Sequence, residues 1–363
     1  MRRFFFKLHL WSSIIASPFI LVFAVTGCFM AFEPELDHLL HARLSYVEPK
    51  GKQLSLGAIS DAIHKAYPLD TIGSYDIATS PGISYKAYTN NQTIYIDQYS
   101  GKILGTMTEP DFWENTQNII HQLHLRLAFH DKHNIGKSIM TWAGVCMLII
   151  LPAGLVLWWK QKQLSIRSGS NSRQFWFDLH SMTGAFVFIF LLVPVVTGVI
   201  IGFEHQTVPL MYKLTSSRPT PMPDIKIISQ PGKKQITPDS ALQAARNALP
   251  GVTPFNINVA GPADAYFIRC RYPEDLTPGG RSMVIIDPYT AKVLYAEGSR
   301  TAPAGTRLKV ATRAIHTGDI FGIPSKFFGL LVCLVLVVQI VSGLKMWLGR
   351  KLKKGAASTK IRQ

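Results

Sequence analysis

The sequence is poor in cysteine and in charged residues. Only 4 of its 363 residues are cysteines, and none belongs to a Cys-x-x-Cys or Cys-x-x-Cys-His pattern. This excludes a disulfide framework, a cysteine-rich metal site and covalent c-type haem attachment. No Gly-x-Gly-x-x-Gly motif follows a candidate strand, so we expect no nicotinamide or flavin fold within the chain. Charged residues make up 17% of the chain and hydrophobic residues 47%, a balance that is unusual for a soluble protein.

Four segments contain no Asp, Glu, Lys or Arg. They are residues 8–32, 138–159, 179–203 and 327–344. A helix needs about 20 apolar residues to cross the hydrocarbon core of a bilayer. We therefore expect four membrane-spanning helices.

The net charge of +16 comes mainly from three short segments that flank these spans. Residues 1–9, 160–179 and 345–363 hold three, four and seven basic residues respectively, and Asp178 is their only acidic residue. Lys and Arg concentrate on the cytoplasmic side of membrane helices. Both termini and the 160–179 loop are therefore expected to be cytoplasmic, with segments 33–137 and 204–326 outside. Because the basic excess reports topology, we expect no nucleic-acid partner.

The chain contains an internal repeat, since residues 6–33 align with residues 177–204 at a constant offset of 171. Among the identical positions are the pairs His9/His180, Thr26/Thr197, Gly27/Gly198 and Glu33/Glu204. Residues 24–28, Ala-Val-Thr-Gly-Cys, also resemble a lipoprotein cleavage site that would end the first span. The same Thr-Gly recurs in the third span, far from the N-terminus, so we interpret it as a small-residue packing face of a retained helix.

The other segments repeat as well. Gly154 and Trp158 in the second span correspond to Gly343 and Trp347 in the fourth. Residues 94–105 and 284–295 are both alternating strand pairs joined by a turn. A short helix precedes each pair, and the second one has Thr237 as its expected N-cap. The expected fold class is membrane α-helical, with four transmembrane helices in two repeats and two small exported α+β modules related by a pseudo-two-fold axis.

Histidine carries the candidate chemistry. His9 and His180 are repeat-equivalent and lie at the cytoplasmic ends of the first and third spans. On the outer side, His124 and His316 stand 13 and 10 residues before a lysine that enters the next span. Ionisable residues near a bilayer usually face a bundle interior or a cofactor. We therefore expect one histidine pair near each membrane face.

A four-helix bundle can hold a haem iron between two imidazoles from facing helices. From His9 to Thr26 there are 17 residues, or about 25 Å of helix. One haem cannot bridge that depth, whereas two stacked haems could carry electrons across. The expected ligands are His9 with His180 and His124 with His316, and the weaker candidates are His121 and His205.

The remaining histidines have simpler interpretations. A lone histidine at a helix end is more often an interfacial polar residue than a ligand. His38 and His41 are three residues apart and could chelate a metal on a helix, but we interpret them as a solvated interface. His130 and His133 lie in a polar turn and are expected to be exposed.

The repeated Leu-His, Thr-Gly and Phe-Glu positions, the segment His-Thr-Gly-Asp-Ile-Phe-Gly-Ile-Pro at residues 316–324 and the paired exported modules resemble the PepSY-associated transmembrane proteins. The resemblance covers nearly the whole chain. The family consists of bacterial inner-membrane proteins, often iron-regulated, and includes periplasm-facing ferric-siderophore reductases. It implies PepSY-like periplasmic modules and two b-type haems held by His9, His180, His124 and His316.

The resemblance further implies that the protein passes electrons across the inner membrane and reduces ferric siderophore in the periplasm. The partners would be the siderophore, membrane lipid and a separate electron donor. We name no catalytic acid or base, because outer-sphere electron transfer does not require one. Reduction would release iron, because hard oxygen donors hold the softer ferrous ion less well. Two alternatives are a membrane-anchored PepSY-type module that binds peptides or regulates proteases without redox activity, and a substrate transporter, for which duplicated spans are suited.

The expected domain boundaries follow from the spans. They are 1–35 for the first transmembrane helix, 36–137 for the first periplasmic module, 138–160 for the second helix, 161–178 for the cytoplasmic loop, 179–204 for the third helix, 205–325 for the second periplasmic module, 326–349 for the fourth helix and 350–363 for the basic tail.

Overall fold

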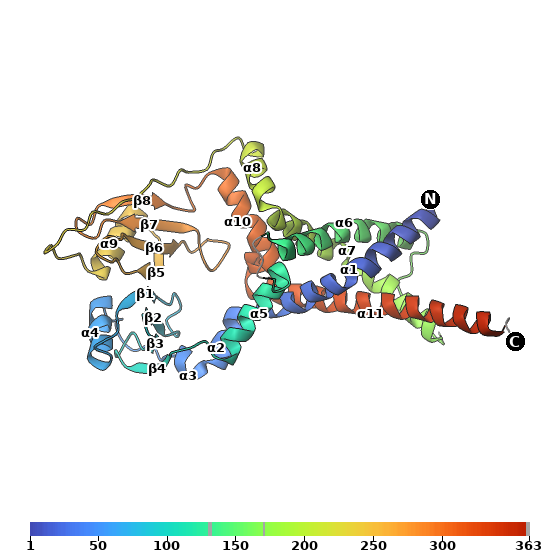
Figure 1. Cartoon of the computed structure of the whole chain (residues 1–363), viewed down its shortest axis with the longest axis horizontal. Coiled ribbons are helices and arrows are strands. Elements are labelled where there is room, and N and C mark those ends of the chain that lie inside the picture. Colours follow the sequence, from blue (N-terminus) through green and yellow to red (C-terminus); the bar gives the residue numbers. More distant parts are fainter. Residues whose placement is uncertain (130–132, 170, 361–363) are drawn as a thin grey trace. The chain divides into compact units, whose positions relative to one another are not determined.

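The computed structural model describes residues 1–129, 133–169 and 171–360, so the expectation for His130 lies outside the described residues. The chain forms two compact units (Figure 1). The membrane unit comprises Met1–Glu33, Thr116–Pro209 and Thr312–Gln363, and the α+β unit comprises Pro34–Asn115 and Leu210–Ala311. Both units are therefore assembled from the two halves of the duplicated chain.

Within the described residues, four helices of the membrane unit are long and apolar enough to cross a bilayer, as expected. They are α1 (Arg2–Ala31), α6 (Ile135–Trp159), α7 (Ser172–Gly202) and α11 (Ile323–Lys360), whose apolar part ends at Gly349. Helices α1 and α7 each pack against both α6 and α11. Helices α1 and α7 consequently lie across the bundle from one another.

Shorter helices connect the spans with the α+β unit. They are α2 (Glu33–Leu40), α3 (Ala42–Ser45), α5 (Phe112–Arg126), α8 (Glu204–Leu214), α10 (Ala304–Thr317) and the 3₁₀ turn η1 (Asp319–Phe321). Helix α5 folds back against the start of α6, where Gly136 is required because a Cβ there would overlap the carbonyl oxygen of Arg126. This close turn places the C-terminal part of α5, with His124, against the membrane bundle.

The α+β unit contains one antiparallel eight-stranded sheet in the described part of the chain, ordered β4-β3-β2-β1-β5-β6-β7-β8. Its strands are β1 (Ile72–Asp76), β2 (Tyr85–Thr89), β3 (Thr93–Ile96), β4 (Ile103–Met107), β5 (Thr253–Asn258), β6 (Tyr266–Arg271), β7 (Ser282–Ile286) and β8 (Val293–Glu297). The two modules meet where β1 pairs with β5, with Tyr75 opposite Ile257. Beside this pair, the Asn256 amide donates to Asp76 at 2.7 Å. Two repeats thus share a single sheet.

Helices α4 (Leu56–Ala66) and α9 (Pro238–Ala248) cover the same face of this sheet (Figure 1). Thr237 caps α9 as expected, with its hydroxyl accepting from the backbone of Ser240. The carboxylate of Asp239 accepts two backbone N–H bonds of 2.8 Å from Leu56 and Gly57 at the start of α4. An acidic side chain at a helix N-terminus satisfies free N–H groups, so α9 of one repeat stabilises α4 of the other.

Replacing Ile257 by alanine should destabilise the α+β unit, because its side chain is fully buried at the β1–β5 junction. Loss of such a side chain costs about 2–5 kcal/mol. The control is Val293→Ala on edge strand β8, where the valine is 37% exposed. Thermal unfolding of the full chain in detergent should show a clearly lower first transition for Ile257→Ala only. Equal transitions for both variants would contradict the shared core.

Candidate cofactor site: two histidine pairs

The structure brings the four expected histidines together as two facing pairs. The rings of His9 on α1 and His180 on α7 have centroids 6.2 Å apart. The rings of His124 on α5 and His316 on α10 have centroids 6.4 Å apart. Two imidazoles that coordinate one metal ion from opposite sides, each through a bond of about 2 Å, have ring centroids about 6 Å apart. Both pairs therefore have the spacing of two ligands on one metal.

Each histidine of the first pair is held by the next helix of its own repeat. His9 Nδ1 lies 2.9 Å from the carbonyl oxygen of Ile150 on α6, and His180 Nδ1 lies 3.1 Å from that of Gln339 on α11. A glycine follows each carbonyl by one helical turn: a Cβ would lie 3.0 Å from His9 Cε1 at Gly154 and 3.5 Å from His180 Cε1 at Gly343. One turn of helix thus provides both the acceptor and the space for the ring.

The second pair uses the repeated Thr-Gly in the same way. His124 Nδ1 lies 2.8 Å from Thr26 Oγ1, and His316 Nδ1 lies 3.2 Å from Thr197 Oγ1 and 3.0 Å from the carbonyl oxygen of Pro194. The glycines that follow the threonines again border the rings, because a Cβ at Gly198 would lie 2.9 Å from His316 Cε1.

These contacts determine the tautomer of each imidazole. A carbonyl oxygen only accepts, so Nδ1 of His9, His180 and His316 must carry the proton. The hydroxyl of Thr26 donates to the carbonyl of Val22, so it accepts from His124 Nδ1. Among the described residues, Nε2 of these four histidines has no hydrogen-bond partner. A histidine whose Nδ1–H bonds to the protein and whose Nε2 is free has the arrangement of a metal ligand.

The charge state of the second pair agrees with this role. Burial lowers the pKa of His124 to about 4, with further lowering by the nearby His316 and His121. Burial also lowers the pKa of His316, against the hydrogen bond to Pro194. Both imidazoles are therefore neutral near pH 7, and the neutral form is the one that binds metal.

The residues of each pair are compatible with a haem, which takes two axial ligands from the protein. Within the residues that the structure describes, no group of three or more His, Cys, Asp or Glu side chains is placed to hold a metal. Each pair offers two imidazole nitrogens, the Nε2 atoms of two neighbouring rings. A porphyrin supplies the equatorial nitrogens and needs only axial ligands from the protein.

The weaker candidates lie elsewhere. Both ring nitrogens of His121 are occupied, Nε2 by Glu33 at 3.3 Å and Nδ1 by the carbonyl of Gln117 at 3.2 Å. His205 is exposed on α8, and His133 is exposed in a turn, as expected.

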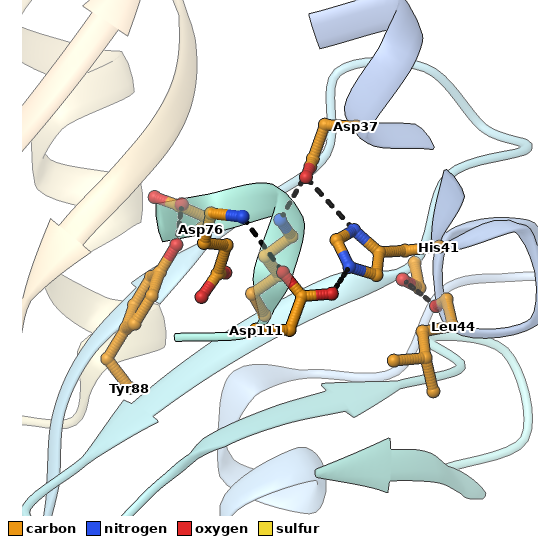
Figure 2. Close-up of polar contacts among 9 residues, drawn as sticks. Asp37, His41, Leu44, Asp76, Tyr88 and Asp111 are labelled. Carbon is orange, nitrogen blue, oxygen red and sulfur yellow. Dashed lines mark hydrogen bonds and ion pairs between the residues drawn. The ribbon is translucent and has the colours of Figure 1, made fainter. Parts of the chain in front are cut away.

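A separate polar cluster in the α+β unit corrects the interpretation of His41. Its side chain is only 9% exposed, so it is not solvated. Figure 2 shows its ring between two carboxylates, with Nδ1 3.0 Å from Asp37 and Nε2 2.8 Å from Asp111. Lys86 contacts Asp37 at 3.3 Å, and Asp111 caps α5 by accepting from the backbone of Glu114. This cluster joins α2 to the start of α5.

The geometry of this cluster favours the imidazolium. Both ring nitrogens face acceptors, so both must donate. Burial lowers the pKa of His41, but hydrogen bonds and charge attraction from Asp111 and Asp37 outweigh it, and the pKa is raised. This cluster could not be predicted from the sequence, because Asp111 lies 70 residues after His41 in the chain.

Together, the fold and the paired histidines define a multi-span membrane protein built from two copies of a helix, α+β module, helix unit. The chain matches the model of the family described as the PepSY-associated TM region over residues 6–350, and it belongs to this family. The resemblance expected from the sequence is therefore confirmed. Among curated proteins, no match to the chain was found.

Adding a methyl group beside a histidine should disturb the bundle. In Gly154→Ala and Gly198→Ala, the new Cβ would lie 3.0 Å and 2.9 Å from ring carbons, and such overpacking costs about 1–3 kcal/mol. Gly329→Ala on α11 is the control, because its Cβ would meet no atom within 4 Å. Thermal unfolding in detergent should show a lower midpoint for the first two variants and no loss for the third. An equally lowered midpoint in all three variants would contradict the conclusion that Gly154 and Gly198 leave room for the histidine rings.

The raised pKa of His41 predicts a pH-dependent contribution to stability. A raised folded-state pKa gives stabilisation that is complete below the unfolded value of about 6.5 and is lost as pH rises through the folded value. His41→Gln should lower the unfolding midpoint of the full chain by about 2–5 °C at pH 5.5 and by less at pH 8.5. His133→Gln, at an exposed position, should have no effect at either pH. An equal loss at both pH values would show that His41 acts as a neutral ring.

Proposed function

We propose that this protein is a bacterial inner-membrane haem protein that carries electrons across the membrane and reduces ferric siderophore in the periplasm. The observation that carries the proposal is the arrangement of four histidines in two facing pairs, with Nδ1 bonded to a neighbouring helix in each case. Chance surface histidines would not repeat this arrangement in both halves of the chain.

A b-type haem at each pair would supply reversible one-electron chemistry. His9 and His180 would hold one haem, and His124 and His316 the other. The carbonyl oxygens of Ile150 and Gln339 keep the proton on Nδ1 and fix the orientation of the two rings. Hydrogen bonds of this kind also raise the basicity of the ligand nitrogen. The chain's contribution is thus to position four neutral imidazoles inside a bundle.

The depth of the two pairs supports an electron path across the membrane. His9 lies near the start of α1, while Thr26, which binds His124, lies near its end. Their separation of 17 positions corresponds to about 25 Å of helix, close to the hydrocarbon thickness of about 30 Å. The distribution of Lys and Arg supports cytoplasmic termini, with the second pair on the periplasmic side.

Ferric siderophore is the substrate that family membership favours. A one-electron reduction gives ferrous iron, which the oxygen donors of a siderophore hold less well. The chain has no Gly-x-Gly-x-x-Gly motif after a strand, so the electrons come from a separate donor. A peptide-binding or protease-regulating module, or a transporter, would use the same spans without needing paired imidazoles.

Visible spectra of the detergent-purified protein test the proposal. We expect two low-spin b-type haems per chain, because each imidazole pair would supply both axial ligands. Substitution of His9, His180, His124 or His316 by alanine should reduce the haem content by about half. The reduced protein should then deliver electrons to a ferric siderophore, measured with a chelator that reports ferrous iron.

The control variants are His121→Ala and His205→Ala, which should keep both haems, since these residues lie outside the pairs. A colourless protein after expression with ample haem would exclude the redox function and leave the α+β unit as the functional centre. If His121→Ala lost one haem and the four paired-histidine variants kept both, our assignment of the haem ligands would be wrong.

A further inference from the structure

The thiols of Cys28 and Cys333 are neighbours, although they lie at opposite ends of the chain. Cys28 belongs to the last turn of α1 and Cys333 to α11, and these two helices pack side by side. The two side chains are close enough to interact with each other, and both thiols are free and half-buried. Among the four cysteines, the structure records this contact for these two.

Gly27 explains how the thiols come so close. A Cβ at this position would lie 3.6 Å from Cys333 Sγ and 3.8 Å from His124 Cε1. Because Gly27 has no side chain, α11 can approach α1 closely at this position. Gly27 also borders the ring of His124. Gly27 therefore lies next to both the thiol of Cys333 and the ring of His124.

The repeat shows that packing alone does not require sulfur here. Cys28 corresponds to Val199 at the offset of 171, and Cys333 corresponds to Gly144 at the offset that relates Gly343 to Gly154. In the second half, Val199 packs directly on Gly144, where a Cβ would lie 3.0 Å from the valine methyl carbon. An aliphatic side chain against glycine fills the equivalent contact, so the two thiols offer something that packing does not need.

We propose that Cys28 and Cys333 form a reversible disulfide that links α1 to α11 beside the His124–His316 pair, with peroxide as the oxidant. The two thiols lose two electrons and two protons as the S–S bond forms. Hydrogen peroxide takes up both, its O–O bond breaks, and two waters result. One thiol first attacks peroxide and becomes a sulfenic acid with release of one water. The second thiol then attacks that sulfur, the S–S bond forms, and the sulfenic hydroxyl leaves as the second water; a neighbouring thiol in contact favours this route over further oxidation.

The consequence for activity rests on the proposed function, whereas the disulfide itself does not. Forming an S–S bond of about 2.05 Å between two thiols that are not yet bonded pulls α1 toward α11. Thr26, two residues before Cys28, binds His124 Nδ1 at 2.8 Å, so the pull reaches the imidazole. Ferrous iron reacts with peroxide, and a reductase that slows under peroxide would limit this reaction.

The experiment uses the full-length protein in detergent. The protein is treated with hydrogen peroxide, its free thiols are alkylated after denaturation, and its peptides are identified by mass spectrometry. We expect a peptide pair that is linked through Cys28 and Cys333 and disappears on reduction. Cys146 and Cys270 should stay free thiols during the peroxide treatment and be found alkylated. The variant Cys28→Val copies the other repeat and should fold but form no link, and Cys146→Ser should behave as the wild type.

The functional arm is separate. Peroxide should slow ferrous release by the wild type several-fold, with recovery on reduction, and leave Cys28→Val unaffected. A link without haem or ferrous release would support the disulfide and overturn the proposed function. A haem-loaded, active protein whose Cys28 and Cys333 stay alkylated, or become irreversibly oxidised without a link, would overturn the disulfide.

Discussion

The hydrogen bond from Nδ1 of each histidine to a neighbouring helix is the interaction on which the rest of the membrane unit depends. It sets the tautomer, the ring orientation and the direction of Nε2 at once. It also requires two helices to lie within ring distance, which is why a glycine borders each of the four rings. Where α1 packs against α6 and α7 packs against α11, the missing side chain of a glycine leaves the room that an imidazole ring needs.

The duplication gives this arrangement a simple logic. His9 is held by Ile150 of its own repeat, and His180 is held by Gln339 of its own repeat. The same holds for the threonines that bind His124 and His316. Each repeat therefore positions one imidazole at each level, and only the pairing of two repeats brings two imidazoles together. In the α+β unit, the β1–β5 pairing likewise joins the repeats through a contact that neither copy can make alone.

The two halves are not equivalent everywhere, and two of the differences lie near the second histidine pair. Glu33 contacts His121, whereas its counterpart Glu204 contacts Lys137 at 3.0 Å. The thiol pair of one half is replaced by Val199 against Gly144 in the other. Since the shared features hold the imidazoles, the features that differ are the ones free to acquire separate roles. A duplicated bundle can in this way keep its paired histidines the same in both halves while other positions diverge.

The sequence by itself determined the four spans, the repeat, the strand pairs and the four paired histidines, because apolar length, alternation and a constant offset are local or periodic signals. The sequence also predicted Thr26–Gly27 as a packing face, which agrees with Gly27 facing Cys333 of α11, but it did not predict that Thr26 binds the ring of His124. It also placed His41 in solvent. Only the tertiary structure decided the acceptors of Nδ1, the partners of His41, the shared sheet and the contact between Cys28 and Cys333. Apart from the contact between His41 and Asp37, which are four residues apart, each of these joins residues far apart in the chain. The spacing of such residues in the sequence does not show that the fold brings them together.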